Sequence, residues 1–164
     1  MKCLSFCCIL LFAAACQQPK SQEINLLKTR IDSLQQTIAN SYRPGLGEFM
    51  SAIQLHHEKL WFAGKNQNWA LADFEIHEIM EALDDINHYC QDRPEVRDLP
   101  MISPALDSLA GSIKNKNLST FNRNYFVLTE TCNSCHQATQ HGFNRIKVPE
   151  TSSFPDQDFS VQTH

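Results

Sequence analysis

Cys132, Cys135 and His136 form a Cys-x-x-Cys-His motif toward the end of a chain of 164 residues. Residues three and four apart share one face of an α-helix, so a helical segment would place both thiols and the imidazole together. Two thiols at this spacing can add to the two vinyl groups on one edge of a porphyrin, while the histidine reaches the iron. The motif is the attachment sequence of c-type haem. The sequence therefore predicts one covalent haem c, with His136 as the proximal iron ligand.

The same cysteine pair has two other interpretations. It could be half of a zinc site or a redox-active Cys-x-x-Cys. A redox motif would need a strand–helix–strand setting that this region lacks. A zinc site would need further ligands, and would make the chain a structural zinc-binding interaction module. The histidines that could supply those ligands are His56, His57, His77 and His88.

The first residues read as an export signal. Lys2 is followed by an apolar run over residues 3–12, which is too short to span a bilayer as a lasting helix. Ala13-Ala14-Ala15-Cys16 resembles the lipobox of bacterial lipoproteins, so we expect a signal peptide over residues 1–15 and a lipid on Cys16. Ordinary cleavage beside an incidental cysteine is the alternative. The lipid reading predicts a location on the periplasmic side of a bacterial membrane, through a lipid anchor.

The seven cysteines do not form a disulfide framework in this interpretation. Three leave with the signal, one takes lipid and two take haem. Cys90 is left alone, and we expect it to be a buried small side chain at the end of a helix. With 14 basic and 18 acidic residues, the surface does not favour nucleic acid as a partner.

Residues 16–41 are predicted to form a polar tether and a short heptad helix. Apolar residues recur there at alternating steps of three and four: Ile24, Leu27, Ile31, Leu34 and Ile38. Isoleucine at a and leucine at d suit a two-stranded parallel coil, which predicts a homodimer through residues 24–38. The alternatives are a helix that folds back on the domain, or a stalk that holds the domain off the membrane.

Residues 42–145 contain four amphipathic segments with helical periodicity. Their apolar stripes run from Leu46 to Gly64, from Trp69 to Ile86, from Leu106 to Ile113 and from Leu118 to Thr139. Asn68 and Ser103 are predicted N-caps, Pro104 follows in the first turn, and a loop of about a dozen residues precedes Ser103. The predicted fold is all-α, a four-helix bundle with an N-terminal helical stalk. Because Cys132 and Cys135 fall on the core-facing stripe, the haem would belong to the interior.

Four such segments with Cys-x-x-Cys-His on the last resemble the class II c-type cytochromes, the cytochrome c prime family, over Leu46 to Phe143. A branch of monohaem bacterial lipoproteins is similar in Gly47-Glu48-Phe49-Met50-Ser51-Ala52, Lys59-Leu60-Trp61-Phe62-Ala63-Gly64, Asn68-Trp69, His136-Gln137-Ala138-Thr139 and His141-Gly142-Phe143. The resemblance implies haem attachment at Cys132, Cys135 and His136. It also implies a first-helix methionine as the sixth iron ligand, which here is Met50. Thr139-Gln140 stands where many members have Phe-Arg, so the usual proximal arginine is absent.

His57, two turns further along the stripe of Met50, is an alternative sixth ligand, and the sixth site could also be empty. A filled site predicts a cytochrome that carries single electrons between redox partner proteins of the cell envelope, without catalytic turnover. An empty site predicts a five-coordinate haem protein that binds NO, CO or peroxide.

Three further expectations concern the surface. Most of the basic residues are expected to be solvated, and those that could instead meet haem propionates are Arg43, Arg123, Arg145 and Lys147. The second segment is expected to have an acidic outer face, formed by Glu75, Glu78, Glu81, Asp84 and Asp85. Residues 146–164 are predicted to be an extended C-terminal tail, either loose or attached through Phe154 and Phe159.

Overall fold

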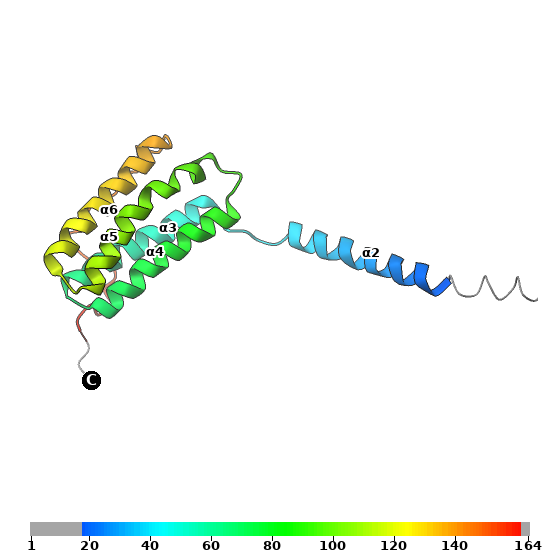
Figure 1. The fold of residues 1–164 in the computed structure, drawn as a ribbon, viewed down its shortest axis with the longest axis horizontal. Coiled ribbons are helices and arrows are strands. Elements are labelled where there is room, and N and C mark those ends of the chain that lie inside the picture. The colour runs from blue at the N-terminus through cyan, green and yellow to red at the C-terminus, as the bar shows by residue number, and fades with distance from the viewer. Residues whose placement is uncertain (1–17, 162–164) are drawn as a thin grey trace, which may run out of the picture. The chain divides into compact units, whose positions relative to one another are not determined.

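The computed structural model describes residues 18–161, and every regular element in that range is a helix (Figure 1). The elements are α2 (Gln18–Ala39), α3 (Leu46–Lys65), α4 (Trp69–Tyr89), the 3₁₀ helix η1 (Pro94–Ile102), α5 (Ser103–Lys114) and α6 (Leu118–Ala138). The prediction of an all-α chain is therefore confirmed. The expected signal peptide and Cys16 lie outside the described residues.

The chain divides into two compact units, Met1–Arg43 and Pro44–His164. The described part of the first unit is essentially α2, a helix of 22 residues. The apolar seam of α2 is exposed along its length, from 50% at Ile24 to 62% at Leu34. Leu26, outside the seam, is also 56% exposed.

In the second unit, the four long helices pack in a closed order around one core. α3 packs against α4, α4 against α5, α5 against α6, and α6 returns to α3 (Figure 1). η1 packs across α4, α5 and α6. The predicted stripes supply most of the core, in which Leu60, Ile76, Leu109 and Phe121 are fully buried. The four helices coincide with the four amphipathic segments of the sequence.

The turns between α3 and α4 and between α5 and α6 are the same motif twice. Gln67 and Lys116 take positive φ angles of 57° and 51°. The amide of the next residue reaches back five positions, from Asn68 to Ala63 O and from Asn117 to Ser112 O. The side chains of Asn68 and Asn117 then cap the following helices. This Schellman geometry ends one helix and starts the next within four residues.

The segment before α5 differs from the prediction of a loop. Residues Pro94–Ile102 form a 3₁₀ helix that runs directly into α5, and Leu99 and Ile102 from it are buried in the core. Ser103 is consequently the first residue of α5 rather than its N-cap, while Pro104 lies in the first turn as predicted. Periodicity did not detect η1 because its two anchoring side chains are too few to form a stripe.

The described part of the C-terminal tail is attached along α3. The Ser153 hydroxyl donates to the Glu58 carboxylate at 2.8 Å. The Phe159 ring lies 5.5 Å from that of Phe62, and the Lys59 ammonium lies 4.9 Å above the ring of Phe154. Both phenylalanines therefore contact the domain.

Candidate functional site

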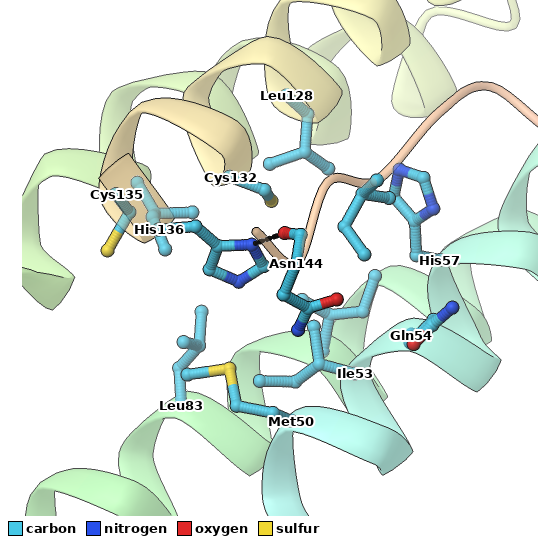
Figure 2. Close-up of a pocket in the computed structure, with 13 residues that line it drawn as sticks. Met50, Ile53, Gln54, His57, Leu83, Leu128, Cys132, Cys135, His136 and Asn144 are labelled. Atoms are coloured by element: carbon cyan, nitrogen blue, oxygen red, sulfur yellow. Dashed lines mark hydrogen bonds between the residues drawn. The ribbon is translucent and has the colours of Figure 1, made fainter. Parts of the chain in front are cut away.

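A small cavity of about 50 Å³ lies between α3, α4 and α6 (Figure 2). Its wall is mostly apolar, with Ile53, Ile79, Leu83, Ile102 and Leu128 among the lining side chains. The residues predicted from the sequence to attach a haem or to bind its iron all line this one cavity: Met50, His57, Cys132, Cys135 and His136. Tertiary packing thus joins residues from the first and last long helices of the domain.

A larger hollow of about 430 Å³ shares Met50, Cys135, His136 and Asn144 with the cavity. Its lining adds three polar side chains that sequence reasoning did not place at the site: Arg93, Glu95 and His141. Arg93 Nη2 lies 2.8 Å from Glu95 Oε1, and this hydrogen bond holds the pKa of Glu95 below its ordinary value. The inner cavity alone is smaller than a porphyrin, and the two spaces together border His136.

Cys132 and Cys135 lie one helical turn apart on α6 and form no disulfide. Cys135 is buried, and Cys132 is partly buried against the core. Burial raises the pKa of the Cys132 thiol to about 12, and it raises that of Cys135 as well. Both side chains are therefore neutral thiols at pH 7, and both line the cavity.

His136 is held by a backbone carbonyl. Its Nδ1 lies 2.6 Å from the carbonyl oxygen of Asn144 (Figure 2). A carbonyl can only accept, so Nδ1 carries a proton, and in the neutral ring Nε2 is then the nitrogen with the lone pair. Metal-bound histidines commonly donate the other ring N–H in this way, which fixes the tautomer and the ring orientation. The arrangement fits His136 as a ligand through Nε2.

Met50 comes from the first turns of α3 and is partly buried against the core. In Figure 2, Met50 and Leu83 lie on the opposite side of the His136 ring from Cys132 and Leu128. A thioether has no proton to lose and no strong hydrogen bond to give up before it binds iron. Met50 therefore lies across the His136 ring from Cys132, and no strong hydrogen bond of its sulfur would have to break before it bound iron.

His57 lines the cavity but uses both ring nitrogens within the protein. Nε2 lies 2.9 Å from Thr129 Oγ1, whose own hydroxyl donates to the Tyr125 carbonyl. The Thr129 oxygen must then accept, so Nε2 carries the proton. Nδ1 lies 3.0 Å from the Tyr125 hydroxyl. Burial lowers the pKa of His57 to about 4, so it is neutral at pH 7. Both ring nitrogens of His57 thus lie against other protein groups.

Of the histidines proposed for a zinc shell, three have hydrogen-bond partners within the protein: His56, His57 and His77. His88 is exposed near the end of α4. His56 Nδ1 lies 2.7 Å from Glu75 Oε2, and His77 Nδ1 donates to the Asp73 carbonyl at 2.6 Å. Between residues 18 and 161, no group of three or more His, Cys, Asp or Glu side chains is arranged to hold a metal ion. His141, five residues after His136, has Nε2 3.9 Å from Glu95.

One expectation about other polar residues needs correction. Glu75 does not belong to an acidic outer face, because it is 1% exposed and paired with His56. The basic residues suggested for haem propionates are all exposed and are absent from the linings of both spaces, which agrees with the expectation that most of them are solvated. Arg93 lines the larger hollow. Cys90 is buried at the C-terminal end of α4, as predicted.

No helix within the described residues is both long enough and apolar enough to cross a membrane. Comparisons of the chain with protein-family models, with characterised proteins and with solved structures found no match.

Proposed function

We propose that this chain is a monohaem c-type cytochrome that carries single electrons in the cell envelope, with haem bound through Cys132, Cys135 and His136. The observation that carries the proposal is the hydrogen bond from His136 Nδ1 to Asn144 O, beside two thiols on the same helical turn. It leaves Nε2 available for a metal, at an apolar space faced by a methionine. The haem supplies a one-electron iron couple.

The residues of the chain have distinct roles in this proposal. Cys132 and Cys135 hold the porphyrin edge, and His136 supplies the proximal nitrogen. Met50 supplies the sixth ligand, and a methionine ligand raises the reduction potential. The apolar wall of the cavity excludes water, which further favours the less charged reduced state.

The wider architecture belongs to the same proposal. Residues 42–145 form a haem-binding four-helix bundle, and α2 is a stalk between this domain and a lipid on Cys16. The anchor places the protein on the periplasmic side of a bacterial membrane, where redox partner proteins exchange electrons with it. Support for the stalk comes from the separate unit that α2 occupies, and support for the anchor comes from the sequence of residues 1–16.

The first test is an absorption spectrum of the oxidised and reduced protein, matured in a bacterium that attaches haem c. We expect a six-coordinate haem that does not bind carbon monoxide when reduced. Met50→Ala should give five-coordinate ferrous iron that binds carbon monoxide at once, with a lower midpoint potential. Met80→Ala is the matched control, because Met80 also packs against the core but lines neither space at His136.

The alternatives give different results in the same experiment. A wild-type protein that binds carbon monoxide at once would favour the five-coordinate NO, CO or peroxide binder. A colourless protein with zinc and alkylatable thiols would favour the structural zinc module and contradict the proposed function.

A further inference from the structure

The chain reverses direction immediately after the haem-motif helix. α6 ends at Ala138, and Gln140 takes a positive φ of 65°. The amide of His141 then donates to His136 O, and the amide of Asn144 donates to His141 O at 2.8 Å. These turns bring residues 144–146 back beside the motif, where Asn144 O meets His136 Nδ1.

The returning segment is held at its far end by a residue of the motif itself. The side-chain amide of Asn133 makes two hydrogen bonds to the backbone of Ile146. Nδ2 donates to Ile146 O at 2.8 Å, and Oδ1 accepts from the Ile146 amide at 2.8 Å. A side-chain amide that satisfies both backbone groups of one residue fixes the position and the orientation of that residue.

The other residue between the two cysteines makes no such contact. The Ser134 hydroxyl donates to Glu130 O within its own helix, and Ser134 is exposed. The two intervening residues of the Cys-x-x-Cys motif therefore differ in role, although both are small and polar.

We propose that Asn133 is a positioning residue for the proximal ligand, acting on His136 through Ile146 and the Asn144 carbonyl. The inference rests on the proposed function and adds a residue that adjusts the midpoint potential of the haem iron. A carbonyl held against Nδ1–H increases the electron donation of the opposite nitrogen to a metal. Stronger donation favours ferric over ferrous iron and lowers the midpoint potential. Asn133 therefore keeps the potential below the value that a freely rotating His136 would give.

The test compares Asn133→Ala with Ser134→Ala in the mature haem protein. Asn133→Ala should raise the midpoint potential and lower the iron–histidine stretching frequency seen by resonance Raman spectroscopy of the five-coordinate ferrous form. To expose that vibration, both variants are also made in the Met50→Ala background. Ser134→Ala should match its parent in both measurements. A potential and a stretching frequency in Asn133→Ala equal to those of Ser134→Ala would overturn the inference.

A second measurement covers the case in which Asn133→Ala does not mature. In the wild-type ferrous protein, the Ile146 amide should exchange with solvent deuterium much more slowly than the amide of Phe143, which is 85% exposed. Equal exchange rates would contradict the hydrogen bonding of Asn133 to the Ile146 backbone, and with it the inference. A wild type without haem would contradict the proposed function. Slow exchange of the Ile146 amide in that haem-free chain would still support the hydrogen bonds between Asn133 and Ile146.

Discussion

At the level of single residues, close packing of Phe121 against α3 requires a glycine at position 64. The Phe121 ring from α6 lies against α3 where Gly64 has no side chain, and a Cβ there would overlap the ring. Phe121 is itself fully buried, with Trp61, Trp69 and Tyr125 rings around it. The ring is therefore enclosed by other aromatic side chains.

Gly64→Ala should therefore destabilise the protein by about 1 to 3 kcal/mol, the usual cost of forcing an extra group into a packed core. The measurement is urea unfolding followed by far-UV circular dichroism. Gly111→Ala, also within a helix but with no atom within 4 Å of the added Cβ, is the control. It should stabilise by about 0.5 to 1 kcal/mol, because alanine is the better helix former. Equal effects of the two changes would contradict this account of Gly64.

The residue level also shows where periodicity misled. Glu75 was expected on an outer face, yet its carboxylate is buried against His56 of α3. A position at the edge of a helical stripe faces a neighbouring helix or solvent, depending on how that neighbour is rotated. Single-helix periodicity does not contain the rotation, so only the packing of α3 against α4 decided the environment of Glu75.

At the level of elements, the chain uses one turn twice. Lys65-Asn66-Gln67-Asn68 and Lys114-Asn115-Lys116-Asn117 share the pattern Lys-Asn-x-Asn, and each joins two antiparallel helices. The sequence signal was present in the repeated asparagines, of which only Asn68 was predicted as a cap. The positive φ at x was not predictable from its residue type, because glutamine and lysine rarely adopt it.

α2 offers a test of the predicted homodimer. In a parallel pair, Ile24, Ile31 and Ile38 would occupy a positions and Leu27 and Leu34 d positions. Glu23 and Lys28 would then take facing g and e positions, where opposite charges attract across the interface. The exposed seam and this complementary pair are compatible with the predicted pairing.

We expect Leu27→Lys to convert the dimer to a monomer, because it places a charge in the seam. Leu26→Lys should leave the dimer intact, since Leu26 is equally exposed but lies outside the seam. Sedimentation equilibrium of the unacylated Cys16→Ser chain and its variants measures the difference. A wild-type monomer, or equal behaviour of the two variants, would exclude pairing through residues 24–38.

At the level of the whole molecule, the His57 network links the first and last long helices of the domain. The Tyr125 hydroxyl donates to His57 O at 2.7 Å and also lies 3.0 Å from His57 Nδ1, so its single proton is shared between two acceptors. Tyr125 and Thr129 lie on α6 and His57 on α3, and all three are buried. Burial lowers the pKa of His57 from 6.5 to about 4, so the network holds a neutral imidazole.

This burial predicts a pH dependence of global stability. Between pH 6.5 and about 4, the unfolded chain protonates His57 while the folded chain does not. The free energy of unfolding therefore keeps its full value above pH 6.5. It falls by about 3 kcal/mol as the pH falls through the whole window. Unfolding free energies from about pH 7.5 to about pH 4.5 measure it. His57→Gln should show a much shallower decline than the wild type.

His77→Gln is the control for that experiment, because His77 is on the exposed side of α4. Its stability should decline with pH as the wild type does. If His57→Gln and His77→Gln declined in parallel with the wild type, His57 would not be the source of the pH dependence.

The sequence by itself determined the helical class, the four amphipathic segments and the Cys-x-x-Cys-His spacing, because these depend on residues within one or two turns of each other. Helical periodicity and the spacing of Cys132, Cys135 and His136 are local in this sense. Tertiary structure decided which groups meet across the core: Met50 with the motif, Arg93 at the larger hollow, and both nitrogens of His57 with Tyr125 and Thr129. It also decided that Asn144 O would meet His136, since that contact depends on how the chain returns after α6. Such contacts depend on the rotation and offset of packed helices, which no local pattern encodes.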